Sequence, residues 1–135
     1  MPVIRRAESR RTETPAAVMT TLASPTQGGA AHALWRVDMR AGRQGPMHSI
    51  DTEQVWTVLE GGATAEIGDQ TVTIDRGDTL VIPADVPRRV TAHPVHGLAA
   101  IVVAPVGMRA YAPGVDVDPH CATPDGGKLI PAWVA

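Results

Sequence analysis

Short runs of apolar and β-branched residues, rich in Val, Ile, Thr and Trp, follow one another along the middle of the chain. Glycine and proline (13 and 12 residues of 135) stand between these runs and predict turns. From residue 32 to residue 111, no stretch has the 3.6-residue apolar period of a helix. The pattern therefore predicts an all-β fold, a sandwich or barrel of antiparallel strands. We expect strands at residues 32–39, 54–60, 63–68, 70–75, 78–83, 88–92 and 98–105, separated by turns at GRQGP, GG, GD, DRGD, PADVP and HPVHG.

The two ends of the chain lack this rhythm. Residues 1–30 are expected to form an N-terminal extension, packed on the barrel or on a partner, in which AESRR could start a short helical turn. Residues 31–111 would form the barrel, and residues 112–135, rich in Pro, Gly and Asp, an extended tail. Because LIPAWV at the end of this tail is apolar, we expect it to dock on the body or on a neighbour. The length of 135 residues fits one domain.

Composition excludes several classes of protein. The formal net charge is -2 and charges of both signs are mixed along the chain, which argues against a nucleic-acid partner. The longest apolar run, LAAIVVAPV, is too short to span a bilayer, and the N-terminus does not read as a signal peptide. The one cysteine, Cys121, gives no disulfide framework. We therefore expect a soluble cytoplasmic protein with no nucleic-acid and no membrane partner.

Two stretches carry the spacing of known motifs. The first, with the form G-x5-H-x-I-x3-Q-x6-G, runs from Gly42 to Gly61, and the second, G-x5-P-x-D-x2-R, runs from Gly77 to Arg88 after fifteen intervening residues. These resemble the first and second motifs of the cupin superfamily, and the likeness covers roughly residues 30–105. The resemblance implies a small single-domain jelly-roll β-barrel, the double-stranded β-helix, with a pocket inside one end.

The chain departs from the family pattern at the positions that bind metal in metal-dependent cupins, which use two histidines and a glutamate of the first motif and a histidine of the second. Those four positions hold His48, Ile50, Gln54 and Arg88. Ile50 has no lone pair, Gln54 offers a neutral amide oxygen, and Arg88 is a permanent cation that cannot ligate a metal. A divalent ion prefers several N or O donors with anionic help. We therefore predict that the metal site is lost and that the protein needs no cofactor.

Neighbouring residues offer only a weak route to restoring a metal site. Glu53 is expected to face away from the pocket if Gln54 faces in, because strand side chains alternate. His93 and His96 fit a solvated HPVH turn, and His32 and His120 resemble ordinary surface residues. A metal enzyme with unusual ligands nevertheless stays open as an alternative.

The resemblance places His48, Ile50, Gln54, Trp56 and Arg88 in one pocket. Arg88 would hold a carboxylate, phosphate or enolate with its planar fork, and His48 would move a proton near neutral pH. Gln54 would hydrogen-bond the ligand, and Ile50 and Trp56 would form apolar wall. The plainer alternatives are that Ile50 and Trp56 are only core and that Arg88 snorkels out of the barrel mouth. A buried polar pair in a small barrel is costly, which favours a function for His48 and Arg88, acting on one ligand from opposite sides.

Three functions remain open at this point. The first is a metal-independent enzyme, such as an isomerase, cyclase, dehydratase or decarboxylase, acting on an anionic or carbonyl-containing metabolite with His48 and Arg88 as catalytic residues. Small stand-alone cupins of this kind often act on metabolites or polyketide intermediates, which suggests secondary metabolism. The second is a non-catalytic module that binds or senses a small ligand, and the third is the unusual metal enzyme. We also expect a homodimer, with TPAAVMTTLASP and LIPAWV as segments suited to cross to the partner.

Overall fold

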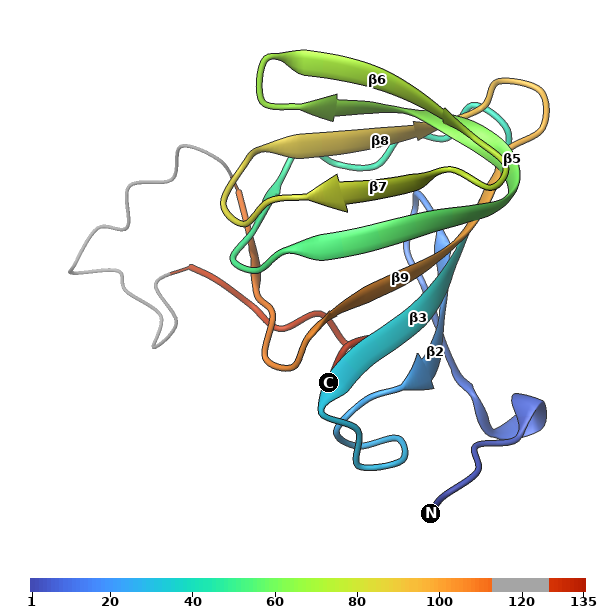
Figure 1. Ribbon diagram of the computed structural model, residues 1–135, viewed down its shortest axis with the longest axis vertical. Helices are drawn as coiled ribbons and strands as arrows, with labels where there is room; N and C mark the ends of the chain where they lie inside the picture. The colour runs from blue at the N-terminus through green and yellow to red at the C-terminus, as the bar shows by residue number, and fades with distance from the viewer. Residues whose placement is uncertain (113–126) are drawn as a thin grey trace.

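The computed structural model describes residues 1–112 and 127–135, and in these residues the regular structure is β apart from one turn of 3-10 helix, η1 (Arg6–Glu8) (Figure 1). The all-β expectation is therefore confirmed, and the expected strands at 32–39, 70–75, 88–92 and 98–105 have the observed bounds. The strands are β1 (Arg10–Glu13), β2 (Val18–Ala23), β3 (His32–Met39), β4 (Ser49–Ile50), β5 (Gln54–Ile67), β6 (Gln70–Asp75), β7 (Thr79–Ile82), β8 (Arg88–Ala92), β9 (Leu98–Pro105) and β10 (Ala110–Tyr111). In the described part of the chain, no helix is long and apolar enough to cross a bilayer.

The expected turn at Gly61 and Gly62 is wrong, because the chain passes through both glycines as one long strand, β5. The pairing register with β9 shifts between Val58 and Glu60, just before the glycines. Gly61 has a φ of 68°, and a Cβ there would collide with the carbonyl oxygen of Gly97. Only glycine fits this left-handed backbone and close approach. The pair of glycines therefore bends a strand instead of ending it.

This bend lets β5 belong to both sheets of the jelly roll. Its first half pairs with β9 and β7, in a sheet that continues through β3, β2 and β1. Its second half pairs with β6 and β8. Figure 1 shows the two sheets sharing the curved β5 strand and enclosing the interior of the barrel. The short strands β4 and β10 pair with each other beside one end of the barrel.

The two chain ends pack on the barrel itself. Strands β1 and β2, which the sequence pattern did not predict, extend the first sheet through antiparallel pairing of β2 with β3. Near the C-terminal end, Val134 is buried and the Trp133 carbonyl accepts a hydrogen bond of 2.7 Å from the Thr21 hydroxyl. Of the two places expected for LIPAWV, the body is therefore the one observed.

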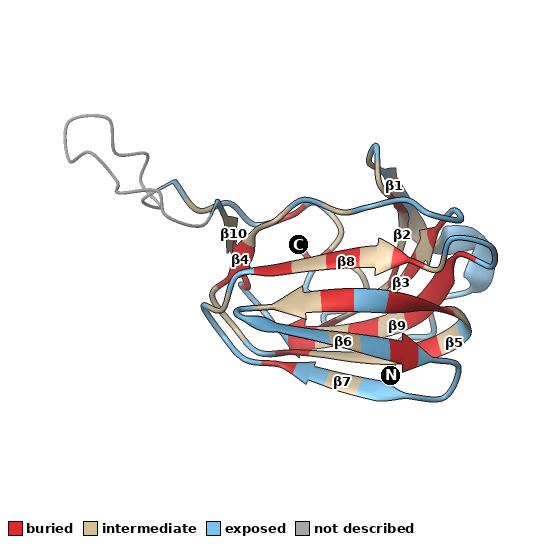
Figure 2. Cartoon of the chain, turned by 90° about the horizontal axis from the view of Figure 1, so that it is seen from above, coloured by how far each residue is buried: buried red, intermediate tan, exposed pale blue. Residues whose placement is uncertain are grey.

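The core side chains lie between the two sheets, on the inner face of each strand. Along β8, buried and half-buried residues alternate, as the banded colours in Figure 2 show. This two-residue alternation is the period of a strand with one face in the core. The core side chains are mainly Ala, Val, Ile, Leu and Met, and Trp35 is the one aromatic residue among the fully buried described residues.

Candidate functional site

A cavity of about 1040 Å³ lies inside the barrel. The five residues that the motif spacing assigned to a pocket, His48, Ile50, Gln54, Trp56 and Arg88, all line it. Ile50, Gln54 and Arg88 are fully buried, whereas His48 and Trp56 are half-buried. The structure thus brings the expected residues together, and their roles in chemistry remain predictions.

The segment before β4 explains why the two motifs meet. It runs antiparallel to β8, with bridges from Gln44 to Thr91 and from His48 to Arg88. His48 and Arg88 exchange both backbone hydrogen bonds, at 3.0 and 2.8 Å. Residues paired in this way project their side chains from the same face of the ladder. The expectation that they act from opposite sides of a ligand is therefore wrong, because they form a cross-strand pair on one side of the cavity.

The His48 ring is fixed in one orientation by its own backbone neighbourhood. Its Nδ1 atom lies 3.0 Å from the Pro46 carbonyl oxygen, which can only accept a hydrogen bond. In the neutral ring, Nδ1 then carries the proton and Nε2 keeps its lone pair. Nε2 has no hydrogen-bond partner among the described residues. Burial and the nearby Arg88 cation lower the pKa of His48 below its ordinary value, so the imidazole is neutral at pH 7 and can accept a proton.

The Arg88 guanidinium is held on several sides and does not snorkel out of the barrel mouth. Nε donates to the Val86 carbonyl at 2.9 Å, Nη2 to the Pro83 carbonyl at 2.8 Å, and Nη1 to the Gln54 side-chain oxygen at 3.4 Å. Burial lowers the pKa of Arg88 to about 10, which leaves the group charged at neutral pH. Since a guanidinium has five N–H donors, two remain for a ligand. Arg88 also ties down the turn before β8, a structural role that the sequence did not indicate.

Gln54 connects the cation to the apolar wall. Its Oε1 atom accepts hydrogen bonds from the Trp56 indole at 3.2 Å and from Arg88, while its Nε2 donates to the Met108 sulfur at 3.3 Å. These partners fix the orientation of the amide, because only an oxygen can face two N–H donors. The expected hydrogen bond from Gln54 to a ligand would have to displace one of these internal partners.

The residues at this site do not fit the divalent metal that the family resemblance implies. Ile50 offers no donor atom, and the one oxygen of Gln54 is already engaged by two N–H groups. The Arg88 cation lies within hydrogen-bond reach of that oxygen and would repel a dication. Among the described residues, no group of three or more His, Cys, Asp or Glu side chains is arranged to hold a metal ion.

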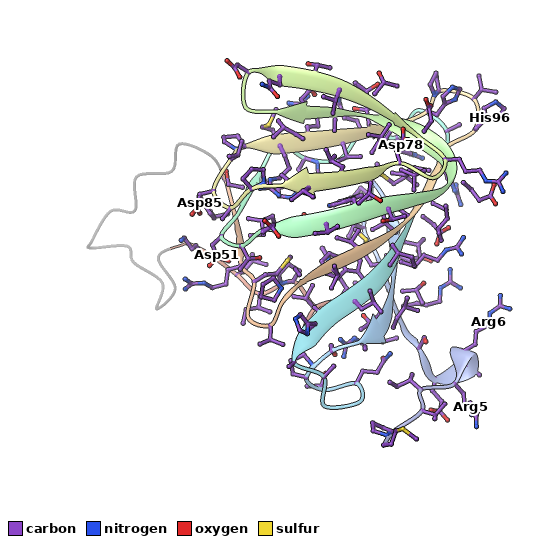
Figure 3. The ribbon with its side chains drawn as sticks, viewed as in Figure 1. Arg5, Arg6, Asp51, Asp78, Asp85 and His96 are labelled. Atoms are coloured by element: carbon purple, nitrogen blue, oxygen red, sulfur yellow. The ribbon has the colours of Figure 1, made fainter. Side chains whose placement is uncertain are left out.

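Among the residues that the structure describes, none of those considered as replacement ligands lines the cavity. Glu53 is exposed. His93 and His96 stack on each other, with ring centres 4.8 Å apart, in the turn between β8 and β9. Figure 3 places His96 at one end of the barrel and Asp51 and Asp85 at the other. His32 is exposed at the start of β3, and His120 and Cys121 fall outside the described residues.

Asp85 lies in the second motif, between Pro83 and Arg88, and has an unusual backbone conformation. Its φ is 63°, the left-handed conformation that glycine adopts most easily and that Asp tolerates. The Asp85 amide donates to the Ile50 carbonyl at 2.7 Å, and its carboxylate accepts the Tyr111 hydroxyl at 2.7 Å. Asp85 therefore joins both motifs to the segment that follows β9.

Most of the cavity wall comes from residues that the motif spacing did not find. Trp35, Met108, Tyr111 and Trp133 line the cavity together with residues 14–17 near the N-terminus. The aromatic composition of the sequence could have identified the aromatic residues of the wall. The chain has no Phe, one Tyr and three Trp, so each aromatic residue is a rare choice.

Comparisons with known proteins agree with this architecture. Residues 35–103, about half of the chain, match the cupin domain family. A gentisate 1,2-dioxygenase from a Streptomyces species is 35% identical over 65 residues, which cover 45% of this chain and 18% of that protein. The chain thus spans less than a fifth of that relative's length.

Two solved structures illustrate the shared fold. The polyketide cyclase RemF from Streptomyces resistomycificus has a TM-score of 0.72 and 21% identity, over 89% of this chain and 90% of that one. The salicylate 1,2-dioxygenase from Pseudoaminobacter salicylatoxidans has a TM-score of 0.65 and 20% identity, over 78% of this chain and 31% of that one. Likeness at this level of identity confirms the jelly-roll barrel.

Proposed function

Because the chain belongs to the cupin family, we propose that its barrel binds a small organic molecule and converts it without a metal. The reaction would be an isomerisation, cyclisation, dehydration or decarboxylation of an anionic or carbonyl-containing metabolite. One observation carries the proposal: a neutral histidine with a free lone pair stands directly beside a buried, charged guanidinium.

This pair is suited to proton transfer next to a carbonyl group. His48 Nε2 takes a proton from an acidic C–H bond, and the electron pair of that bond moves onto the carbonyl oxygen to give an enolate. The free N–H groups of Arg88, whose side chain is buried, hold the negative charge. The imidazolium then returns the proton to another carbon, to a carbonyl oxygen as the enolate carbon attacks it, or to a departing hydroxyl group.

The family relatives give the proposal its metabolic setting. One solved structure of this fold is a polyketide cyclase, and the curated relative is a gentisate dioxygenase. Both names refer to oxygenated organic compounds, which supports an oxygenated metabolite as the substrate and a place in secondary metabolism.

Solvent deuterium exchange tests the proposal without knowledge of the natural substrate. The chelator-washed protein is incubated in D₂O with carbonyl compounds that have an acidic C–H bond, such as 2-tetralone, and incorporation is followed by NMR. We expect exchange above the buffer rate with at least one compound. Binding without any exchange would overturn the catalytic proposal.

A non-catalytic binding module is the second candidate. This candidate is favoured because Arg88 and Gln54 form most of their hydrogen bonds with other groups of the protein. Few of their donors and acceptors are therefore free to take part in a reaction. In that case His48 would contribute to affinity alone.

We also propose that the protein is a homodimer. The two segments expected to cross to a partner, TPAAVMTTLASP and LIPAWV, instead contact their own barrel, so the dimer would form through another surface. Light scattering at micromolar concentration measures the mass, and a monomer would overturn the proposal.

A further inference from the structure

All four aromatic residues of the chain line the same cavity. They are Trp35 on β3, Trp56 on β5, Tyr111 on β10 and Trp133 near the C-terminal end. Fewer than a quarter of the described residues line this cavity, and the rest of the buried core is built without aromatic rings. Apart from Trp35, which belongs to the core and also lines the cavity, the fully buried core is built from aliphatic side chains and methionine, and every aromatic side chain reaches the cavity.

Flexible sulfur-containing side chains complete the wall. Met19, Met39 and Met108 line the cavity beside the aromatic rings. Methionine adapts its shape to a ligand and makes favourable contacts with aromatic rings. The Trp56 indole N–H is already bonded to Gln54, so this ring offers its apolar surface to a ligand.

His48, Gln54 and Arg88 are connected or adjacent polar groups of this wall, and the polar side chains of Thr14, Arg43, Gln44 and Tyr111 also line the cavity. A cavity of about 1040 Å³ is at the upper end of the range for drug-sized ligands and is large for an acid of a few carbons. A well-matched ligand has an oxygen at one edge and a broad, flat apolar body.

We infer that the ligand is a planar, conjugated or fused aromatic compound with a carbonyl, phenolate or carboxylate oxygen at one edge. The inference rests on the proposed function in placing the substrate in this cavity. The oxygen bonds to Arg88, and the plane of the ligand packs against the indole rings, by offset stacking or edge-to-face contact.

Isothermal titration calorimetry on the full chain compares two probes that share a carbon skeleton and differ in aromaticity and flatness. Both 2-naphthoate and trans-decalin-2-carboxylate have a fused-ring skeleton and a carboxylate, but only the first is planar. We expect 2-naphthoate to bind about 10-fold more tightly, since each favourable ring–ring contact is worth roughly 3- to 10-fold. This preference falls in Trp56→Leu and Trp133→Leu, is partly kept in Trp56→Phe, and is unchanged in the control Thr73→Ala on the outer face of the polar sheet.

Equal affinity for the two probes, no binding of either, or an unchanged preference in both leucine variants overturns the inference. If a leucine variant fails to fold, as judged by circular dichroism, Trp56→Phe and Trp133→Phe serve in its place. Because naphthoate binding needs no proton transfer, the preference is also measured in His48→Ala. If the wild type prefers 2-naphthoate but catalyses no deuterium exchange, only the proposed catalysis is wrong. If it catalyses exchange but shows no preference between the two probes, only this inference is wrong.

A second, independent observation concerns the outside of the barrel. On the sheet that contains β3, β9, β5 and β7, the side chains of Leu34, Val103, Val55 and Val81 stand directly opposite one another in register. Val81 is 53% exposed and the other three are half-buried. Strand β9 is apolar along its whole length, a pattern typical of strands covered on both faces. We call this outward row of Leu34, Val103, Val55 and Val81 the outer stripe.

The opposite sheet has no such stripe. Its outward residues on β5, β6 and β8 are polar in each cross-strand row, and they are Thr64, Glu66, Thr71, Thr73, Asp75, Arg89 and Thr91. Apart from Arg88, which faces the cavity, the same strands alternate between apolar inside and polar outside, as expected for a sheet that faces water. The contrast shows that one sheet carries an apolar row on its outer face, beside a row that holds Arg36, Thr57 and Thr79, whereas the outer face of the other sheet is polar.

The size and charge of the sheet face that holds the outer stripe fit a second copy of this chain. Its strands lie about 4.8 Å apart, β3 and β9 are eight residues long and β7 has four, so the face covers at most about 19 by 27 Å. That is on the order of 500 Å² per copy and about 1000 Å² in total, the lower bound for a specific interface. At its rim, Arg36 pairs with Asp38 at 2.9 Å, and Glu60 adds to the charge that raises the pKa of Arg36. A rim with both signs can match itself across a two-fold axis.

The geometry points to a homodimer in which the outer stripes of two copies pack face to face. Light scattering and circular dichroism test it with Val103→Glu in the outer stripe and Thr73→Glu on the polar sheet as the matched control. We expect about twice the chain mass of 14.2 kDa for the wild type and for Thr73→Glu, and the chain mass for a folded Val103→Glu.

If Val103→Glu fails to fold, Val81→Lys at the exposed edge of the outer stripe replaces it. A monomeric wild type, which would leave the face for some other protein, overturns the proposal. A dimer that persists in folded stripe variants overturns it as well.

Discussion

The polar end of the cavity and its aromatic wall are held in place in different ways. His48, Gln54 and Arg88 are fixed by directed hydrogen bonds, most of them to backbone carbonyls or to one another within the two motifs. Trp35 and Trp133 are held by packing between β3 and the C-terminal segment. Directed bonds fix atoms at the precision that chemistry requires, whereas packing fixes a surface and its shape.

This difference predicts that substitutions in the two regions change different measured properties. A change at the polar end should alter turnover or the binding of an anionic group. A change in the wall should alter the preference among ligands together with thermal stability, because it removes buried apolar surface.

The largest effect is expected for His48→Ala. If Nε2 moves a proton, turnover falls by about 10²- to 10⁴-fold with little change in ligand affinity or melting temperature. The deuterium exchange assay measures turnover, and His32→Ala, at an exposed histidine, is the matched control. Loss of affinity with no turnover in the wild type would instead favour the binding module.

Arg88→Lys is expected to weaken binding of a carboxylate probe by about 10-fold, because lysine keeps the charge but loses the planar fork. It also removes hydrogen bonds to the carbonyls of Pro83 and Val86, so the free energy of unfolding falls by about 1–3 kcal/mol. Calorimetric titration and thermal unfolding measure the two effects, with Arg89→Lys on the outer face as the control. If Arg88→Lys has the affinity and the melting temperature of the wild type, Arg88 is not part of the binding site.

A smaller effect is a shift in the pH profile. The pKa of His48 is lowered by burial and then by Arg88, so the neutral base persists below its ordinary pKa of 6.5. Activity is therefore lost only as the pH falls through this lower value. Arg88→Gln removes the cation and moves the acidic limb of kcat/KM to higher pH, whereas Arg88→Lys leaves it nearly unchanged. An acidic limb above 6.5 in the wild type would contradict the assignment of His48 as the base.

The lowered pKa of His48 also makes a prediction about stability. The unfolded chain binds the proton more readily, so acidification through the interval below 6.5 lowers the free energy of unfolding. His48→Ala should lose less stability than the wild type between about pH 7 and pH 5. Thermal unfolding at a series of pH values measures the difference, and parallel curves would argue against the lowered pKa.

Metal removal is expected to have no effect. Ile50 and Arg88 at two of the family's ligand positions leave no competent donor set, so chelation should change neither turnover nor melting temperature. Elemental analysis after purification without chelator checks the prediction. About one Zn, Fe, Mn or Ni per chain would overturn it and return the unusual metal enzyme to consideration.

Much of the barrel and the membership of the polar end followed from the sequence. Strand β9 and the inward position of Gln54 and Trp56 depend on apolar runs and on a two-residue period, which are local properties. The motif spacing brought His48 and Arg88 to one pocket, 40 positions apart, because it encodes the length of the intervening strands and turns. The glycine pair was misjudged since its role depends on Gly97, a residue far along the chain.

By itself, the sequence determined the all-β class, most strand positions and the chemical character of the polar end, because alternation and residue type act over a few neighbouring positions. Only the tertiary structure decided that His48 and Arg88 stand side by side, that the Pro46 carbonyl leaves Nε2 free, and that Trp35 and Trp133 share one wall. These features arise where segments distant in sequence meet. Their geometry depends on strand register and close packing, and the pattern of residue types along one sequence does not specify either.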